Sequence, residues 1–590
     1  MTQPVSEEEA SERASTDGRI AFGLAAFSFA ALLIALLDRV GVPNRLVAAL
    51  GPTLAICGLA LIGVLLRSMR VSRFYAGGRS VPYPYAGLAT AALLTGLFAP
   101  FLPPARGAAS LEAMLAGFGL GALLACFVTG PLLRKSGAFS LPDLLAARFP
   151  QTALRLGVAA VVSVVSFFVA AAAYEIAARG LQTGLGMERR GAIVMAGCAI
   201  ALIAAPGGLA GVIWAALAAG VVLVTGTGLP IAILDAQGGT VPLPFLAPAT
   251  WSAAMTRMDT WTRLGSPRPV GGLVFALALA IGVGVLAPVI APCIATRHRR
   301  AAHQAARTTL VALIAVGVLL AVSLAAATLA TDSSLVGKAP DQLPAYAYDA
   351  SGRGLLTICG RPAGSAALAL QACRTTAGFK GVLRTQDVTA QGAFLATALP
   401  LLRGSGAAFG GLAAAGMIAI ALALAASAFQ ALATAIGHDS LYRLRGAGAL
   451  TSRRLAATRA VLLAAIVGTG AALTHQSVDA REMIIIAIAF STAAVAPLVA
   501  LTFWPRASAS DAIFALLCGL GSAEAIFLAQ GGTPRLETLA SGALVACLAG
   551  VLAGLASSLL RSPDPLRKGA VFIERIFHGE GDVLNPDKGA

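Results

Sequence analysis

Long apolar stretches alternate with short polar connections along most of the chain. A helix rises about 1.5 Å per residue, so ~20 apolar residues cross the ~30 Å of hydrocarbon in a bilayer. About 14 stretches approach or meet this length, at residues 20–37, 46–66, 84–102, 111–133, 153–178, 192–205, 209–234, 270–294, 308–330, 409–436, 455–473, 483–504, 513–528 and 539–560. The pattern predicts an all-α polytopic membrane protein with about 14 transmembrane helices.

Two of these stretches contain helix breakers at corresponding places. Residues 84–102 carry Gly87 and Gly96 between flanking prolines, and residues 270–294, five spans later, carry Gly282 and Gly284 followed by two prolines. Interrupted spans at corresponding places in two halves of a chain point to a transporter's binding site. If each half is one copy of a repeat of five spans, the odd number of spans places the two copies in opposite orientations in the membrane. We therefore expect a five-plus-five inverted repeat with a solute site at the gap. The alternative is that the glycines serve only close helix packing.

The same pattern divides the chain into segments. We expect a polar tail at 1–18, two amino-terminal helices within 19–67, a transporter core at 84–504, two carboxy-terminal helices within 511–560 and a second tail at 561–590. The core divides further into a first repeat at 84–234, a second repeat at 270–504 and, inside the second repeat, an outer loop at 331–407.

Composition excludes a soluble globular protein. Of the 590 residues, 57% are hydrophobic and only 12% are charged, about half the charged share of a soluble domain. The formal net charge is +16, which in a soluble chain would suggest a polyanion partner. Here the basic residues lie in short loops between spans, so they indicate membrane orientation and not nucleic-acid binding.

Basic residues gather on one side of the predicted membrane. The clusters are Arg67, Arg70, Arg73 and Arg79; Arg134, Lys135, Arg148 and Arg155; Arg297, Arg299, Arg300 and Arg307; Arg443, Arg445, Arg453, Arg454 and Arg459; and Arg561, Arg567 and Lys568. Cytoplasmic loops carry an excess of Lys and Arg, so this side, with both termini, is predicted to be cytoplasmic. Arg179, Arg189 and Arg190 fall on the opposite side and are the exception.

Sequence motifs for catalysis are absent. The chain has no GxxxxGK[ST] phosphate loop, no GxSxG elbow and no cysteine and histidine set with metal spacing, so we expect neither an enzyme nor a bound metal or cofactor. Cys359 and Cys373 lie together in the outer loop, where an oxidising compartment would favour a disulfide; two free thiols are the alternative.

Few polar residues remain at membrane depth. Thr90 and Thr95 beside the first interruption are the predicted solute contacts, unless each bonds back to its own helix. Ser163 and Ser166 share one face of a later span and are predicted either to contact solute or to pack.

Three further residues are candidates for ion coupling. Glu175 is a carboxylate within a predicted span, and such a residue is by default a candidate for a functional role. The alternative is that it forms an ion pair with Arg179, four residues later. Ser427 and Gln430 lie three apart on one helix face, and a glutamine at this depth needs either a functional role or a helix-to-helix hydrogen bond.

Several blocks of sequence resemble the sodium:solute symporter family, and most closely its cation/acetate symporter branch. They are RFYAGGRSVPYPYAGLA at 73–89, GPLLRKSGAFSLPDLLAARF at 130–149, PGGLAGVIW at 206–214, IGHDSLYRL at 436–444 and VALTFWPRAS at 499–508. The resemblance implies an inner-membrane secondary transporter of LeuT-like fold. In this family sodium influx is coupled to uptake of a small solute, here a monocarboxylate such as acetate, by alternating access, with the site between the first and sixth core helices.

The chain departs from the family pattern at the coupling positions. Where relatives place an aspartate on the first core helix this chain has Leu93, and where many carry paired hydroxyls for sodium it has Ala423 and Leu424. Other polar positions of the family read Val289, Cys293, Ala173 and Ala216. Sodium prefers oxygen ligands, so coupling is expected to use backbone oxygens for Na+, to use H+ through Glu175, or to be absent.

Two functions follow as hypotheses. The first is a symporter-like permease for a small organic solute, whose carboxylate would sit at the half-helix amino termini around Gly87–Gly96 and Gly282–Gly284. The second is a non-transporting member of the family that acts as a membrane scaffold or solute sensor. In either case the partners are a small molecule and the lipid bilayer.

Overall fold

The computed structural model describes residues 7–101, 111–236, 242–243, 245–262, 269–352, 356–376, 378–390, 407–442, 451–529, 536–561, 568–577 and 582–583. Among these residues, 13 helices are long and apolar enough to cross a membrane, or 14 if one bent pair is counted as a span. The prediction of an all-α polytopic protein with about 14 spans is confirmed.

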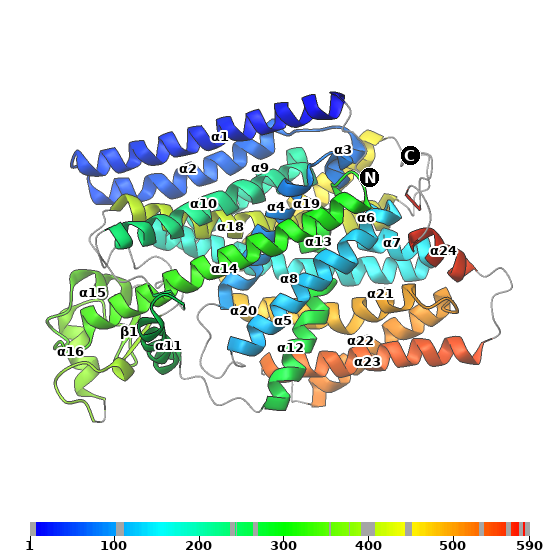
Figure 1. Ribbon diagram of the computed structural model, residues 1–590. Helices are drawn as coiled ribbons and strands as arrows, with labels where there is room; N and C mark the ends of the chain where they lie inside the picture. The colour runs from blue at the N-terminus through cyan, green and yellow to red at the C-terminus, as the bar shows by residue number, and fades with distance from the viewer. Residues whose placement is uncertain are drawn as a thin grey trace.

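The helices form one elongated bundle (Figure 1). Before the core lie α1 (Glu7–Arg39) and α2 (Asn44–Leu65), and the short α3 (Val71–Ala76) leads into it. The first five-helix unit consists of α4 (Tyr83–Phe98), α5 (Leu111–Leu124) continued by α6 (Gly130–Ser136), α8 (Thr152–Leu185), α9 (Arg189–Gly207) and α10 (Leu209–Ala236), with the short α7 (Leu141–Arg148) before α8.

The second unit repeats this order. It consists of α12 (Pro269–Gly284) continued by α13 (Ala287–Ile294), α14 (Arg299–Leu335), α18 (Ala407–Thr434), α19 (Thr451–His475) and α20 (Ala480–Phe490) continued by α21 (Ala496–Thr502). Two helices, α22 (Ala509–Ala529) and α23 (Leu536–Leu560), pack against each other beside the core, and α24 (Lys568–Phe577) follows.

The centre of the bundle is α18, which packs along α8, α10 and α2. Its residues are mostly alanine, glycine and leucine, so neighbouring backbones can approach closely. Gly416, for example, faces the backbone of Leu223 on α10, where an added Cβ would lie 2.7 Å from the Leu223 Cα. By contrast, α1 lies at the periphery and is mostly exposed in the bundle.

Only one of the two predicted interruptions is present. Helix α4 runs without a break from Tyr83 to Phe98, which corrects the expectation of an interrupted first core helix. Its glycines serve packing: a Cβ on Gly87 would lie 2.5 Å from the Ala305 carbonyl oxygen of α14, and a Cβ on Gly96 would lie 3.3 Å from the Ile420 carbonyl oxygen of α18.

The second interruption is real. Helices α12 and α13 meet at a bend of 42°. Pro288 lacks an amide hydrogen, so the carbonyl of Gly284 loses its helical donor and instead accepts from the Thr129 hydroxyl. The Gly282 carbonyl accepts from the Ser491 hydroxyl at 3.0 Å. Hydroxyls of neighbouring helices thus satisfy the backbone that the break exposes.

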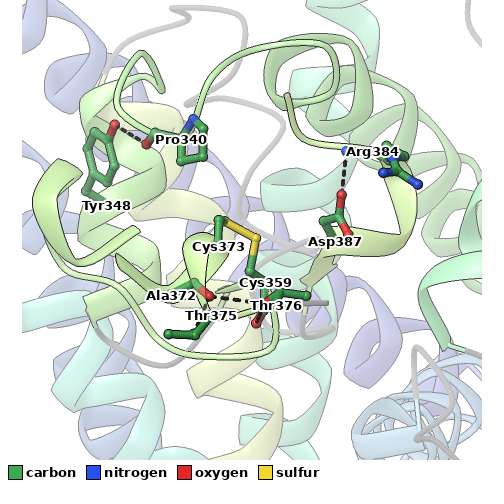
Figure 2. The surroundings of a disulfide bond; sticks show 9 residues. All are labelled: Pro340, Tyr348, Cys359, Ala372, Cys373, Thr375, Thr376, Arg384 and Asp387. Carbon is green, nitrogen blue, oxygen red and sulfur yellow. Dashed lines mark hydrogen bonds between the residues drawn. A yellow bond between two sulfur atoms is a disulfide. The ribbon is translucent and has the colours of Figure 1, made fainter. Parts of the chain in front are cut away.

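A small folded cap covers one end of the bundle (Figure 1). It contains α11 (Pro248–Thr262), α15 (Ala345–Gly352), α16 (Ala366–Arg374) and the antiparallel strands β1 (Leu356–Ile358) and β2 (Val388–Ala390). We call this the cap end. A disulfide joins Cys359 to Cys373, as the sequence analysis expects, and Figure 2 shows it between β1 and α16.

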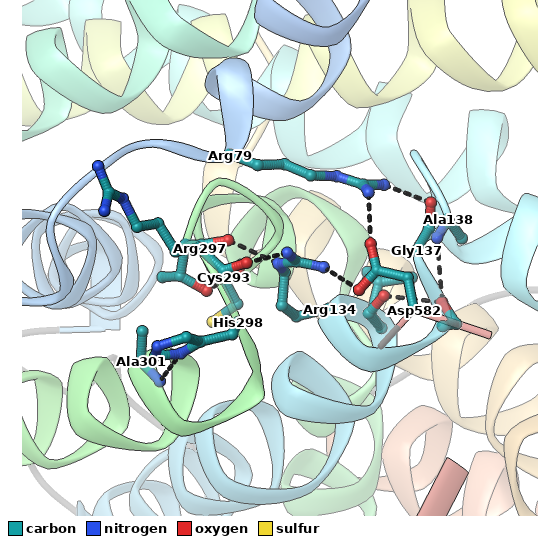
Figure 3. A network of polar contacts seen from close by, with 12 residues as sticks. Arg79, Arg134, Gly137, Ala138, Cys293, Arg297, His298, Ala301 and Asp582 are labelled. Carbon is teal, nitrogen blue, oxygen red and sulfur yellow. Dashed lines mark hydrogen bonds and ion pairs between the residues drawn. The ribbon is translucent and has the colours of Figure 1, made fainter. Parts of the chain in front are cut away.

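The opposite end holds both chain termini and most of the basic clusters, and we call it the basic end (Figure 1). There Asp582, from the carboxy-terminal segment, lies between Arg79 and Arg134 (Figure 3). One of its carboxylate oxygens lies 2.7 Å from the Arg79 guanidinium, and the other lies 2.7 Å from the Arg134 guanidinium. Arg134 also donates to the Thr296 carbonyl at 2.6 Å and to the Arg297 carbonyl. These contacts connect the carboxy-terminal segment to both five-helix units.

Candidate functional site

A cavity of about 40 Å³ lies between α8, α13 and α18, in the half of the bundle nearer the basic end. Its floor comes from α3 and the start of α7. The lining residues are uncharged: Tyr75, Leu133, Phe139, Ser140, Leu141, Pro142, Val162, Leu209, Ala287, Ile290, Ala291, Ile294, Ser427, Gln430, Ala431, Thr434 and Ala435. One water needs ~10–15 Å³, so the cavity is large enough to hold water.

Gln430 is the polar centre of this cavity. The side chain is 3% exposed, and neither its amide nitrogen nor its amide oxygen has a hydrogen-bond partner among the described residues. Burying an amide without partners costs on the order of 1–3 kcal/mol. Each of the two amide atoms exposes less than 1 Å² of surface, so in this conformation the amide is buried beside the cavity and does not open into it.

The four hydroxyls that line the cavity are already hydrogen-bonded. Ser427 donates to the Pro288 carbonyl at 2.6 Å, and Thr434 donates to the Gln430 carbonyl at 2.8 Å. Ser140 donates to Asp439 at 2.6 Å. The Tyr75 hydroxyl pairs with the Thr458 hydroxyl at 2.6 Å.

A buried charged cluster lies behind the floor. Asp143, His438 and Asp439 bring ligand atoms within 4.8 Å of one another, a spacing that could hold a metal ion. However, Arg454 places Nη2 2.8 Å from His438 Nδ1 and 3.0 Å from Nε2. A guanidinium already supplies the positive charge at this point, so the donor set does not fit an added cation well.

Tyr75 separates that cluster from the cavity. Burial raises the pKa of Tyr75, an effect that the Thr458 hydrogen bond and the charge of Arg454 partly offset. The phenol therefore stays neutral, and the Arg454 guanidinium stacks 5.0 Å above the centre of its ring. The result is an uncharged wall with charges of both signs directly behind it.

The predicted solute contacts lie outside the cavity wall. Thr90 donates to the Ala86 carbonyl and Thr95 to the Ala91 carbonyl, both at 2.8 Å, and Ser163 donates to the Ala159 carbonyl at 2.7 Å. Ser166 is fully buried with no partner for its hydroxyl among the described residues. It lies one helical turn from Val162, which does line the cavity.

The four glycines predicted to frame the site pack against neighbouring helices. Gly87 and Gly96 face α14 and α18, as described above. A Cβ on Gly282 would lie 2.5 Å from the Ile488 carbonyl oxygen, and one on Gly284 would lie 2.8 Å from the Leu124 Cβ. Their predicted contact with solute stays a prediction; none of the four lines the cavity.

The predicted coupling residues separate into two groups. Ser427 and Gln430 line the cavity together. Glu175 lies at the cap end, fully buried, and accepts hydrogen bonds from Arg179 at 2.6 Å and from Arg189 at 2.9 and 3.0 Å. The ion pair with Arg179 is the alternative that the sequence analysis left open, and Arg189 adds a second cation.

Leu93, Ala423 and Leu424 stand where the resemblance leads us to expect polar side chains. All three are fully buried, and α4 contacts α18. Their apolar side chains therefore offer no side-chain oxygen to an ion at these positions.

Sequence reasoning missed three polar members of the cavity wall, namely Tyr75, Ser140 and Thr434. Tyr75 lies near the end of the short α3, and Ser140 is the N-cap of the short α7, so neither belongs to a predicted span. Each lies in one of the five blocks that carry the family resemblance, at 73–89 and 130–149. Those blocks were the signal that could have identified both residues.

Comparison with known proteins agrees with the architecture. The model of the sodium:solute symporter family matches residues 74–348. A substrate-bound, outward-open structure of a Na+-coupled sialic acid symporter superposes with a TM-score of 0.61 at 17% identity, covering 88% of this chain and 99% of that one. Two structures of a manganese transporter from Eremococcus coleocola, both of mutants, give TM-scores of 0.42 and 0.40 at 13% identity, covering 83% of this chain and 95% of theirs.

No curated protein sequence matches the chain. The structural match covers almost the whole symporter chain and confirms the predicted fold. This protein therefore has the LeuT-like, all-α polytopic fold of that symporter, and residues 74–348 match the sodium:solute symporter family.

Proposed function

We infer that this protein is a secondary transporter that moves a small organic solute across a membrane by alternating access. The observation that carries the inference is the fold, which superposes on almost the whole chain of a solved symporter and holds a cavity beside the buried, unpaired amide of Gln430. A buried polar group that is left unsatisfied is expected to have a ligand or a functional role. The basic clusters support an orientation with both termini in the cytoplasm, and the family resemblance supports a bacterial inner membrane.

Contacts at the two ends support a gated pathway. At the cap end, Arg481 at the start of α20 donates to the Pro100 carbonyl, just past the end of α4, at 2.7 Å. At the basic end, Asp582 connects Arg79 and Arg134. Polar contacts of this kind can break and re-form, and we propose that they are the places at which the two ends of the bundle open.

The solute class is a short monocarboxylate, and Na+ is a weak candidate for the coupling ion. The first statement comes from the resemblance of the sequence to the acetate branch. The second comes from the methyl groups of Ala423 and Leu424 at the sodium positions. The same methyl groups favour the second candidate function, a non-transporting scaffold or sensor.

Uptake by purified protein distinguishes the two functions. Proteoliposomes would be given labelled acetate, pyruvate or proline with a sodium gradient, a proton gradient or neither, and protein-free liposomes would measure passive leak. We expect uptake of a short monocarboxylate above the leak, without a requirement for Na+. Absence of both uptake and counterflow for every solute, from protein that unfolds cooperatively on heating, would favour the scaffold or sensor.

A matched pair of variants locates the pathway. Gln430→Leu removes the free amide at nearly constant volume and is expected to reduce uptake at least tenfold. Ser163→Ala removes a hydroxyl that bonds to its own helix, away from the cavity wall, and is expected to leave uptake unchanged. Equal uptake by both variants would exclude the cavity as the route.

A further inference from the structure

The floor of the cavity is made of two short pieces of chain at the basic end. One piece is α3, which contributes Tyr75 and is followed by Arg79. The other is the turn between α6 and α7, which contributes Phe139. Arg79 joins the two pieces, because its guanidinium donates to the Gly137 carbonyl and lies 5.5 Å from the centre of the Phe139 ring. On the proposed route, a solute that leaves the cavity toward the basic end has to part these pieces.

The carboxy-terminal segment lies against this floor (Figure 3). The Asp582 carboxylate pairs with Arg79 and with Arg134 of α6, at 2.7 Å to each. A Cβ on Gly137 would lie 3.0 Å from the Asp582 Cβ, so the segment is in direct contact with the turn. Asp582 therefore fastens the piece of chain after α3 to the piece before α7.

Asp582 also holds two like charges together. The side chains of Asp582 and Arg134 are only 8% and 5% exposed, and that of Arg79 is 18% exposed. Burial lowers the pKa of Arg79, the neighbouring charge of Arg134 lowers it further, and Asp582 raises it. Once the carboxylate leaves, the two guanidinium groups repel each other at a site that water screens only partly. Departure of Asp582 thus favours separation of the two floor pieces.

The contacts allow Asp582 to leave while the helix before it stays in place. Asp582 is held by ion pairs, and the partly buried Val583 adds one hydrogen bond from its amide to the Lys135 carbonyl, at 3.2 Å. Helix α24 is held by apolar packing, because Phe572 and Ile576 are buried. Asp582 lies five residues after the end of α24. A released Asp582 therefore remains close to the two arginines, and re-closing is an intramolecular step.

We propose that the carboxy-terminal segment is an autoinhibitory latch, which closes the basic end of the solute pathway through Asp582 and slows transport until it is released. This regulation rests on the proposed transport function, because the latch acts on the floor of the cavity which that function uses. Release breaks the two ion pairs and the hydrogen bond of Val583, and water solvates the same groups when the floor opens.

Access to a thiol in the cavity tests the latch without any transport. Ala431 is half-buried in the cavity wall on α18. Full-length Ala431→Cys protein in detergent would be labelled with a water-soluble maleimide, and mass spectrometry would follow each labelled position. Native Cys547, buried on α23, reports general loosening of the bundle. With Asp582→Asn added, we expect labelling at position 431 to be about fivefold faster or more, because loss of a buried ion pair shifts an opening equilibrium by at least that factor. Labelling of Cys547 is expected to stay unchanged.

Two more variants separate the latch from the effect of an unpaired charge. Arg79→Gln removes one of the two like charges and one of the two ion pairs, so it leaves Asp582 paired with Arg134, and we again expect faster labelling at position 431. Glu574→Gln removes a negative charge from an exposed position on α24 and is expected to label as the parent does. The latch requires faster labelling in both Asp582→Asn and Arg79→Gln. Acceleration in neither, in only one of them, or only in step with Cys547 would overturn it.

Uptake shows whether the latch limits transport. The solute is whichever of labelled acetate, pyruvate and proline the parent protein carries. Asp582→Asn and Arg79→Gln are expected to raise the initial rate at least about twofold, since a smaller closed population leaves more protein competent to open. An unchanged or lower rate, with the cavity thiol more accessible, would show a structural fastening and overturn autoinhibition. If the folded parent and variants carry none of these solutes, the transport function and its inhibition are both overturned, and thiol labelling decides separately whether the segment closes the basic end.

Discussion

Most buried hydroxyls in this bundle are satisfied by their own helix. Thr90, Thr95 and Ser163 each donate to the carbonyl four residues earlier, which removes most of their polarity from the interior. A glutamine has two polar groups at the end of a longer side chain, and both need partners. Gln430 is therefore distinct from most of the surrounding threonines and serines, because its buried amide has no partner among the described residues.

Glu175 illustrates the opposite case of a fully satisfied polar residue. Glu175→Gln removes the negative charge but keeps the shape, and leaves Arg179 and Arg189 without a counter-ion. Their side chains are 53% and 26% exposed, so water screens part of the loss, and we expect destabilisation of about 1–3 kcal/mol. Thermal unfolding in detergent measures it.

The exposed Glu188 supplies the control for that substitution. Glu188→Gln makes the same change at the same end of the bundle and is expected to have little effect on stability. Glu175→Gln is also expected to leave the effect of a proton gradient on uptake unchanged. A changed effect of the proton gradient would return Glu175 to the list of proton-coupling residues.

At the scale of helices, glycine determines which pairs can approach. The pairs α4 with α14 and α12 with α20 meet where Gly87 and Gly282 face a carbonyl oxygen of the partner helix. Such close contact replaces the hydrophobic driving force that helices lack inside a bilayer. The glycines that the sequence analysis read as helix breakers thus serve as contact points between helices, and only the break after Gly284 is present.

Adding a methyl group at one of these points should destabilise the bundle. Gly282→Ala would place a Cβ 2.5 Å from the Ile488 carbonyl oxygen, and overpacking of this kind costs ~1–3 kcal/mol. Gly317→Ala, on α14 with nothing within 4 Å, is expected to be neutral or to stabilise by up to ~1 kcal/mol through helix propensity. Equal unfolding temperatures for the two variants would contradict the packing role.

The cap gives a second prediction about a single element. The disulfide between Cys359 and Cys373 closes a segment with a sequence separation of 14, and a loop of this length is worth ~3 kcal/mol in the chain-entropy view. Replacing both cysteines by serine should speed hydrogen exchange in β1, β2 and α16 and leave exchange in α18 unchanged. Faster exchange throughout the core would show instead that the cap stabilises the whole bundle.

The sequence predicted the elements better than it predicted the site. Spans follow from apolar length alone, and the bend between α12 and α13 follows from Pro288. The continuity of α4 could not be predicted, because it depends on whether a neighbouring backbone faces Gly87. Likewise, Ser427 and Gln430 could be found within one helix, whereas Tyr75 and Ser140 reach the cavity only through tertiary packing.

The whole molecule is connected at its basic end by its carboxy-terminal segment. Asp582 forms ion pairs with Arg79, which precedes the first core helix, and with Arg134 on α6. Helix α24 packs beside it: Phe572 and Ile576 are buried, and Arg299 donates to the Ile576 carbonyl at 3.3 Å. One short segment thus holds parts of both five-helix units in a fixed relation.

Loss of the charge on Asp582 should therefore loosen this end of the molecule. Asp582→Asn leaves two arginines close together with side chains only 18% and 5% exposed, and an uncompensated buried charge of this kind costs ~3–5 kcal/mol. Arg134 keeps its carbonyl partners, so we expect a value near the lower end, read as a lower unfolding temperature. Faster hydrogen exchange in α6 and around Arg79, with exchange in α20 unchanged, would place the loss of stability at the basic end. The control is Asp341→Asn, which makes the same change at an exposed position in the cap. If Asp582→Asn lowers the unfolding temperature no more than this control does, the two units hold together without the carboxy-terminal segment.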